Sequence, residues 1–496
     1  MREKEYLTKH YSAILSAIGI IFIISFAVML SPLLLLPVYP EEMKHAWAFL
    51  LPAGILGGCG VLLRRIFRRN AYVVLSIQEG GIIVLVSWSA VIFFSAWPLS
   101  LVLGIDFSRA VFESVSAWTT TGLSVVDVTR AGKLILFWRS AMQLAGGAGL
   151  AVIMMSTIMG PTGVGISGAE GRGDQLVPHV RRSARLVLLI YLGYACAGIA
   201  AYRLAGMSLF DAVNHSFAAV STGGFSTRPE SIGFWDSPAI EAVSIPLMLL
   251  GNLSFVTAWY LWKGEFRAVF RNGEVRLMSA LIPFSAAVVF IFTCKSLYPH
   301  LEKAFRVAVF ESISALTTTG FSTVSYGNWN AFGLFILIVL MLIGGGTCST
   351  AGGIKQFRIH LLWNLLIWEF KRAMMQRQAI LDRSVWEGDK RILVDDTRIR
   401  QISAFIFLYM AIYGAGVAVM CACGFSLQDS LFEFASAIGT VGLSIGVTSA
   451  TMPGLALWAE TLAMFLGRLE FIVVIVSLLK IGRDGRLLMR PTVKGN

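Results

Sequence analysis

The sequence predicts an all-α integral membrane protein. Of its 496 residues, 56% are hydrophobic and only 14% are charged, whereas a soluble globular domain carries about 25% charged residues. Several apolar runs reach the roughly 20 residues that a helix needs to cross a bilayer. Examples are residues 12–36, 134–160, 186–205 and 405–424. A chain of this composition cannot be a soluble globular enzyme or binding module.

The net charge of +12 is explained by topology. Most of the lysines and arginines lie between the apolar stretches, in the segments 1–10, 64–70, 161–185, 263–276, 355–400 and 480–496. Basic loops stay on the cytoplasmic side of a membrane, so we expect these segments and both termini to be cytoplasmic. The spacing of the charge therefore argues against a nucleic-acid partner.

Four short segments of the chain resemble one another, and each contains an aligned glycine. They read TTTGLS (119–124), STGGFS (221–226), TTTGFS (317–322) and GTVGLS (439–444). Nine residues before the aligned glycines stand Glu113, His215, Glu311 and Glu433. Agreement at several offsets in four copies indicates an internal repeat.

The repeat divides the chain into a two-helix leader and four units. We place the leader at 1–70 and the repeats at 71–160, 186–262, 277–378 and 398–480, followed by a tail at 481–496. Each repeat contains a spanning helix, a short amphipathic segment, the glycine loop and a second spanning helix. In the connector 355–400 we expect cytoplasmic helical segments.

The glycine loops are the best candidates for a functional site. Glycine adopts positive φ without a steric penalty, so a loop built around it can turn successive carbonyl oxygens to one side. Non-helical backbone at membrane depth is tolerated where protein or a water-filled cavity surrounds it. Four loops around one axis satisfy that condition for one another and resemble a ring of carbonyls that replaces the hydration shell of an ion. The alternative is ordinary close packing of helices through small residues.

The predicted fold is therefore four helix–pore loop–helix pseudo-repeats around one pore, plus an N-terminal helix pair. The short helices should end at the pore, where the negative end of the helix dipole favours a cation. The candidate ion-binding residues of the four loops are Thr120, Thr121, Gly122, Leu123, Thr222, Gly223, Gly224, Phe225, Thr318, Thr319, Gly320, Phe321, Thr440, Val441, Gly442 and Leu443.

These motifs resemble the Trk/Ktr/HKT superfamily of cation transporters, and within it the bacterial TrkH-type potassium uptake subunits. The resemblance covers essentially the whole chain. In that family the four filter glycines favour potassium, and serine at the first is associated with sodium preference. All four positions are glycine here, but the second repeat has Gly223 where the others have Thr121, Thr319 and Val441.

A second glycine-rich segment interrupts the last helix of the third repeat. It reads IGGGTCSTAGGIK (343–355), and a helix cannot easily continue through it. The family resemblance implies an intramembrane gating loop. The gate residues would be Gly344, Gly345, Gly346, Thr347, Ser349, Thr350, Gly352, Gly353 and Lys355, together with Arg468. A phosphate-binding loop is the alternative, but the required glycine–lysine spacing and a preceding strand are both missing.

Arg468 lies within an apolar run, and an intramembrane charge indicates a functional residue. The resemblance places it in the cavity below the filter; the alternative is a structural salt bridge with Glu470 or another acid. Glu113, His215, Glu311 and Glu433 are expected to brace the loops through hydrogen bonds rather than to bind ions. Asp127, Glu230 and Asp236 follow the loops on the outer side, where they either concentrate cations or form a solvated face.

The sequence therefore predicts a potassium uptake protein of the bacterial inner membrane, passive or coupled to another ion, and no enzyme. A sodium-conducting or sodium-coupled member of the same superfamily is the main alternative; a sodium-coupled solute transporter and a membrane enzyme are further ones. The resemblance implies a homodimer and a TrkA-type cytosolic ring that binds the nucleotide, so this chain itself needs no cofactor beyond potassium as substrate. The basic residues available to dock that ring are Arg172, Arg181, Arg182, Lys263, Arg267, Lys371 and Arg372.

Overall fold

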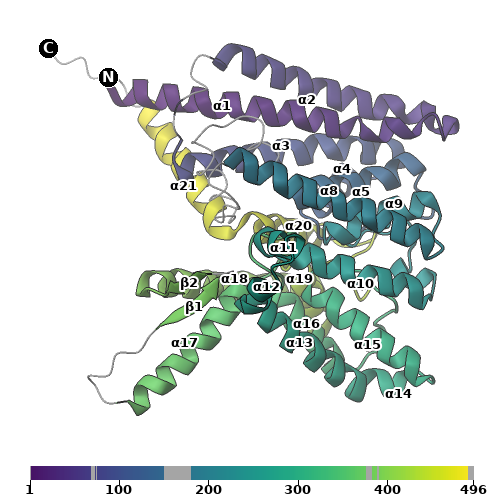
Figure 1. Cartoon of the computed structure of the whole chain (residues 1–496). Helices are drawn as coiled ribbons and strands as arrows, with labels where there is room; N and C mark the ends of the chain where they lie inside the picture. Colours follow the sequence, from purple (N-terminus) through teal and green to yellow (C-terminus); the bar gives the residue numbers. More distant parts are fainter. Residues whose placement is uncertain are drawn as a thin grey trace.

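The computed structural model describes residues 2–68, 73, 75–149, 180–375, 383–387 and 390–489. Helices dominate this part of the chain (Figure 1). Six helices in it are long and apolar enough to cross a membrane, and two strongly bent helix pairs would raise that number to eight. The prediction of an all-α multi-pass membrane protein is therefore confirmed.

The leader is a pair of long helices, α1 (Arg2–Met29) and α2 (Ala46–Phe67), joined by the 3₁₀ turns η1 (Ser31–Leu35) and η2 (Pro40–His45). They lie side by side along one edge of the molecule (Figure 1). Gly19 and Gly60 make this close approach possible, because an added Cβ at either would lie within 2.8 Å of the other glycine's carbonyl oxygen. Small residues at such crossings allow helix backbones to pack tightly in a membrane.

Each repeat begins with a helix that precedes the pore segment. These are α3 (Ile77–Leu103), α8 (Val180–Leu204), α13 (Gly273–Val289) and α18 (Asp396–Ala422). In the third repeat, the π-helical turn η6 (Phe290–Cys294) and α14 (Lys295–Leu297) extend α13. Ser76 caps α3 in a capping box with Glu79, which satisfies amide groups that would otherwise lack partners.

Short helices follow in all four repeats, as predicted. They are α4 (Phe107–Trp118), α9 (Leu209–Val220), α15 (Leu301–Leu316) and α19 (Leu427–Ile438). The side chains of Asp106, Ser208 and Ser426 cap the N-termini of α4, α9 and α19. Each helix ends directly before its glycine loop.

The second helices of the repeats are α5 (Lys133–Ala148), α10 (Pro238–Asn252), α16 (Ala331–Ile343) and α20 (Gly454–Leu469). Two of them break and change direction. The chain bends by 117° between α10 and α11 (Phe255–Trp262), and by 96° between α20 and α21 (Phe471–Met489). The apolar run around Arg468 reads as part of one last spanning helix, but Glu470 between α20 and α21 has a left-handed φ of 63°, which no α-helix accommodates.

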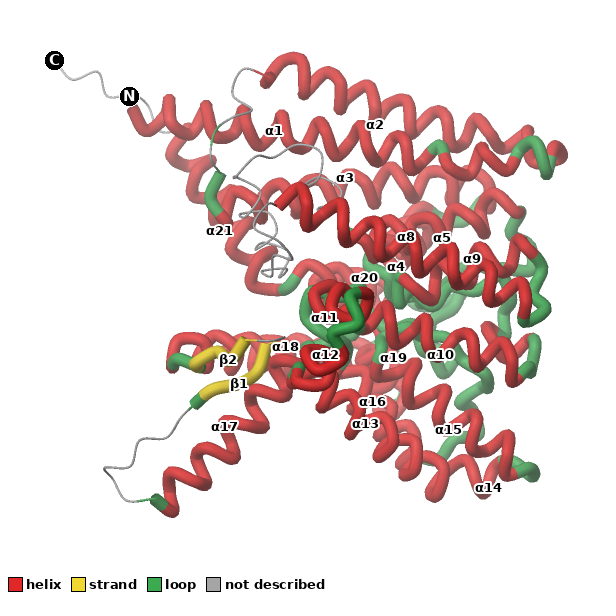
Figure 2. The backbone as a smooth tube through the Cα atoms, in the orientation of Figure 1, coloured by secondary structure: helices red, strands yellow, loops and turns green. Residues whose placement is uncertain are grey.

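The connector after the third repeat differs from our expectation. Helix α17 (Gln356–Met374) is followed by an antiparallel hairpin of β1 (Ser384–Glu387) and β2 (Lys390–Leu393), not by a further helix (Figure 2). Val385 is buried against Leu361 and Trp368 of α17. The short helix α12 (Phe266–Arg271) lies between α11 and α13.

Candidate functional site

The four glycine loops meet in one closed ring. A Cβ built on Gly122 would lie 2.3 Å from the carbonyl oxygen of Gly223 in the second repeat. The same construction on Gly224, Gly320 and Gly442 reaches the carbonyl oxygens of Thr319, Val441 and Thr121, at 2.1, 2.0 and 2.2 Å. Each glycine therefore faces the next repeat, and the fourth faces the first. No side chain fits at these positions without displacing a neighbouring carbonyl.

The backbone of the loops repeats one unusual conformation. The aligned glycines have φ between 72° and 100°, and so do not tolerate an L side chain well. Two residues earlier, the threonines Thr120, Thr222, Thr318 and Thr440 also have positive φ, between 49° and 56°. This region is rarely occupied by a β-branched residue. Backbone strain shared by four copies is typical of a functional site.

The amide groups at the start of each loop are occupied by the preceding short helix. In the first repeat, Thr121 N–H donates to the carbonyl of Ser116 at 2.8 Å and Thr120 N–H to that of Ala117 at 3.1 Å. The other three repeats make the same two bonds, at 2.8–3.0 and 3.1–3.2 Å. Because these two N–H groups already donate to carbonyls of the short helix, they do not bind the loop carbonyls at the ring.

Buried carboxylates hold the chain that leaves each loop. Glu113 accepts from Ser124 Oγ at 2.9 Å and Val125 N–H at 3.0 Å, while Glu433 accepts from Ser444 Oγ at 2.6 Å and Ile445 N–H at 3.1 Å. Glu311 accepts from Thr323 N–H at 2.8 Å and from Tyr326 Oη, and His215 Nε2 lies 2.9 Å from Ser226 Oγ. All four side chains are fully buried. These contacts agree with the bracing role that we expected for them.

The sequence analysis missed a buried partner of Glu113, the carboxylate that braces the first loop. Arg139 of α5 is 2% exposed, and its Nε lies 2.7 Å from Glu113 Oε1. Its guanidinium also lies over the Phe225 ring in the second repeat, 3.9 Å from the centroid. A signal was present in the sequence, because a lone arginine in an apolar helix is uncommon.

A cavity opens on the side of the ring where the loops leave their glycines, which is the side expected to be outer; it is lined by all four loops and by Asp127, Arg139 and Arg228. Asp127 is the only one of the three predicted outer acids among these lining residues. Asp236 forms ion pairs with Lys303 at 2.8 Å and Arg306 at 3.3 Å. Its charge is thus compensated locally, and Asp236 is less suited to concentrating cations than we expected.

The glycine-rich segment 344–355, between α16 and α17, lies directly against the opposite end of the ring, which is formed by the loop threonines and is expected to be the inner one. Thr318 Oγ1 accepts from Gly352 N–H at 2.8 Å, and Thr222 Oγ1 donates to Thr350 Oγ1 at 3.1 Å. A Cβ on Gly352 would lie 2.0 Å from Thr440 Oγ1. The loop threonines with positive φ therefore contact this segment from three repeats at close range. Thr120 Oγ1 of the remaining repeat lies 3.5 Å from the Thr350 carbonyl.

Other side chains anchor the same segment. Thr350 Oγ1 donates to the carbonyls of Gly251, at 2.8 Å, or Val220, at 3.2 Å. Glu274, at the start of α13, accepts from Thr347 N–H at 2.7 Å, and Lys355 Nζ donates to the Ala351 carbonyl. Glu274 was not a predicted gate residue.

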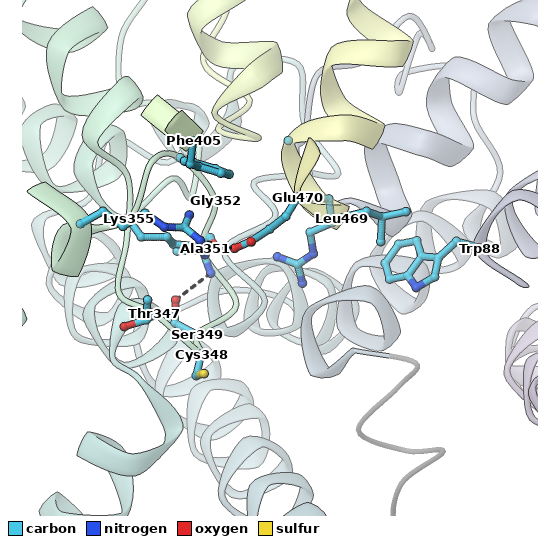
Figure 3. Close-up of a pocket in the computed structure, with 14 residues that line it drawn as sticks. Trp88, Thr347, Cys348, Ser349, Ala351, Gly352, Lys355, Phe405, Leu469 and Glu470 are labelled. Atoms are coloured by element: carbon cyan, nitrogen blue, oxygen red, sulfur yellow. Dashed lines mark hydrogen bonds and ion pairs between the residues drawn. The ribbon is translucent and has the colours of Figure 1, made fainter. Parts of the chain in front are cut away.

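Arg468, at the end of α20, donates to two backbone carbonyls. One belongs to Thr350 in the glycine-rich segment and the other to Gly146 in α5, at 2.8 Å. Glu470, which we had considered as its partner, instead forms an ion pair with Arg358 of α17, at 2.7 Å. Arg358, Arg468 and Glu470 line a cavity below the ring, in which Glu470 points toward the segment that carries Ala351 and Gly352 (Figure 3).

The structure thus brings the predicted loop residues into one ring and the predicted gate residues beneath it. The basic residues considered for partner docking are more scattered. Lys371 and Arg372 lie in the last turn of α17, whereas Lys263 and Arg267 flank the junction of α11 and α12. Arg172 lies outside the described residues, as do the side chains of Arg181 and Arg182.

Comparison with known proteins agrees with this architecture. The family TrkH, described as cation transport protein, matches residues 64–272 and 273–487. The chain belongs to this family. Its members are ion transporters, so the chain is a transporter and not an enzyme.

Two curated relatives and one solved structure illustrate the similarity. The Trk system potassium uptake protein TrkH of Halomonas elongata is 30% identical over 482 residues, covering 93% of this chain and 97% of the relative. An uncharacterized cation transporter of Methanocaldococcus jannaschii is 30% identical over 432 residues, or 86% and 87% of the two chains. The crystal structure of the potassium transporter TrkH from Vibrio parahaemolyticus superposes with a TM-score of 0.82 at 26% identity, covering 98% of this chain and 100% of that one.

Proposed function

We propose that this protein takes up potassium across the cytoplasmic membrane through the ring of four glycine loops, which acts as its selectivity filter. The observation that carries the proposal is the closed ring itself, in which each glycine faces a carbonyl of the next repeat. Backbone carbonyls substitute for the hydration shell of potassium in such filters. The relatives named as potassium uptake proteins support potassium as the ion.

The test is ion flux in proteoliposomes, measured with potassium, sodium and rubidium for the parent and for Gly122→Ser. The serine Cβ would overlap the Gly223 carbonyl, at 2.3 Å, and would have to adopt a φ of 94°. We therefore expect the carbonyl ring to distort and the potassium-to-sodium flux ratio to fall by about tenfold, the equivalent of about 1.4 kcal/mol.

Gly54→Ser in α2 is the matched control, because a Cβ there meets nothing within 4 Å. It should retain the parental flux ratio. An unchanged ratio in a folded Gly122→Ser protein would contradict the filter assignment. Sodium flux equal to potassium flux in the parent would favour the alternative, a sodium-conducting or sodium-coupled transporter.

We further propose that segment 344–355 gates this pore. Support comes from its position against the inner threonines of the ring and from its anchoring by Arg468. The five glycines of the segment allow it to rearrange with little steric cost, and movement away from the threonines would open the inner side. The cationic Arg468 beside the passage would lower cation occupancy there.

In this proposal a cytosolic TrkA-type ring, which carries the nucleotide, controls segment 344–355 from the cytoplasmic face. The transporter works as a homodimer in the inner membrane, with both termini in the cytoplasm. Support for the partner comes from the relatives named as parts of a Trk system. Helix α17 continues directly from the gating segment and ends in the basic pair Lys371 and Arg372, which offers a mechanical connection. Loss of partner binding in Lys371→Glu/Arg372→Glu, with basal flux retained, would test this docking site.

A further inference from the structure

The second repeat of the ring departs from the other three at one position in its loop. Gly223 stands where the other repeats have Thr121, Thr319 and Val441. Its φ is not positive, so backbone conformation does not require glycine there. A Cβ on Gly223 would lie 2.4 Å from Cδ of Gln143. The side chain is therefore missing because Gln143 occupies its space.

Gln143 reaches this loop from a different repeat. It lies in α5, the second helix of the first repeat, and is fully buried. Its Nε2 donates to the Gly223 carbonyl, and its Oε1 accepts from Phe225 N–H at 3.3 Å. One side-chain amide thus spans the aligned Gly224 and holds the backbone on both sides of it.

The second repeat also lacks the hydroxyl that supports the other loops. Ser116 Oγ accepts from Gly122 N–H at 3.1 Å and donates to the Leu123 carbonyl at 2.6 Å. Ser314 Oγ donates to the Phe321 carbonyl at 2.6 Å, and Ser436 Oγ accepts from Gly442 N–H at 2.9 Å. The equivalent residue of the second repeat is Ala218, which has no hydroxyl. Gln143 holds the same stretch of loop from outside the repeat, through the Gly223 carbonyl and the Phe225 N–H rather than through the two groups that the serines bind.

The position of Gln143 in its helix is itself exceptional. In each repeat the second helix contains a glycine in its last turn or directly after it: Gly146, Gly251, Gly344 and Gly467. In the first, second and fourth repeats this glycine packs against the carbonyl of the last residue of the short helix. Three residues before these glycines stand Gln143, Met248, Met341 and Met464. Three repeats therefore place a buried methionine where the first repeat places an amide.

Gln143 binds the Gly223 carbonyl, and Gly223 N–H donates to the Ala218 carbonyl at 2.8 Å, so the three exchanges follow one another through Gly223. The Gly223 carbonyl is the ring carbonyl that faces Gly122. We propose that Gln143 is a positioning residue for ion selectivity, which fixes the Gly223 carbonyl and holds the one loop that lacks the serine hydroxyl of the other repeats. This inference rests on the proposed filter. Its physical basis is that a buried carbonyl and a buried amide lose their hydrogen-bond partners when Gln143 is removed, so the loop relaxes and the ring no longer discriminates by size.

The experiment compares Gln143→Met, which installs the residue of the other repeats, with the parent in the same proteoliposome flux assay. We expect the potassium-to-sodium flux ratio to fall by about tenfold, the equivalent of about 1.4 kcal/mol, because the Gly223 carbonyl and the Phe225 N–H both lose their buried partner. The triple variant Gln143→Met/Ala218→Ser/Gly223→Thr gives these three positions the residues that the third repeat has at its equivalent positions, and it should recover most of the lost ratio. Met464→Leu, at the equivalent position of the fourth repeat, should leave the ratio unchanged.

Thermal unfolding shows whether each variant is folded. The flux ratio then reports selectivity alone, because it does not depend on the amount of folded protein. A parental ratio in folded Gln143→Met would overturn the inference. If Gly122→Ser alters the ratio while Gln143→Met does not, the filter stands and only the role of Gln143 fails. If neither alters it, the filter itself is wrong. A triple variant no better than Gln143→Met would overturn the claim that the three exchanges compensate one another.

Discussion

Thr350→Val tests the proposed gate with an almost isosteric change. The Thr350 hydroxyl donates to the carbonyl of Gly251 or of Val220, at 2.8 and 3.2 Å, and accepts from Thr222 Oγ1 at 3.1 Å. It therefore connects the segment below the ring to the ring itself and to α10. Valine keeps the shape and removes all of these bonds.

The expected cost follows from burial. Thr350 is 1% exposed and Thr222 is fully buried, so the lost partners are not replaced by water. A buried group left without its hydrogen bond costs about 1–3 kcal/mol. We take a cost of about 2 kcal/mol and assume that it falls on the closed position of segment 344–355 alone. The equilibrium between the closed and open positions then shifts by roughly thirtyfold toward the open one.

The assay is basal rubidium tracer uptake into proteoliposomes without any regulatory partner. Thr350→Val should raise the basal rate, up to the limit set by the fully open pore. Thr350→Ser retains the hydroxyl and should behave as the parent does. A folded Thr350→Val protein whose basal rate equals that of Thr350→Ser would refute the idea that these contacts hold the segment closed.

Two further predictions concern stability. Arg139→Met leaves the fully buried Glu113 without its 2.7 Å ion-pair partner and should destabilise the protein by about 3–5 kcal/mol; the double variant Glu113→Gln/Arg139→Met should be more stable than Arg139→Met in thermal unfolding, and an equal or lower melting temperature would contradict the pairing. Asp236→Asn removes the ion pairs with Lys303 and Arg306, which lower the pKa of the Asp236 carboxyl from its usual 3.8. Because the pKa is lower in the folded than in the unfolded protein, the stability that this carboxylate contributes is present at neutral pH and is lost as the pH falls below 3.8. At neutral pH we expect the variant to have a free energy of unfolding about 0.2–1 kcal/mol below that of the parent. A stability difference between parent and variant that did not narrow in acid would argue against this cause.

Much of the site could be predicted from local sequence. The aligned glycines and the short helices before them recur at matched offsets, so the four loops could be assigned without knowing how they meet. Glu113 and Glu433 could be given a bracing role because they stand two helical turns before the loop. The hairpin after α17 could not be predicted, because a charged segment of that length carries no strong periodicity.

Other parts of the site depend on contacts between distant segments. Gln143 and Gly223 are 80 residues apart, and no local pattern connects them. Glu470 was the nearest acid to Arg468 in sequence, yet it pairs with Arg358, because the bend after α20 redirects its side chain toward α17. Sequence proximity identified the charged groups but not their partners.

Composition and internal repetition by themselves determined that this chain crosses the membrane many times and carries four related loops. Both are local properties, since the length of an apolar run and the offset of a glycine can be read without any contact. Only the tertiary structure decided that the loops close into one ring, that segment 344–355 lies against its inner threonines, and that the second repeat takes its support from the first. Those outcomes depend on which surfaces pack together, and the packing of buried polar groups at a few ångströms is set by the whole fold rather than by any one segment.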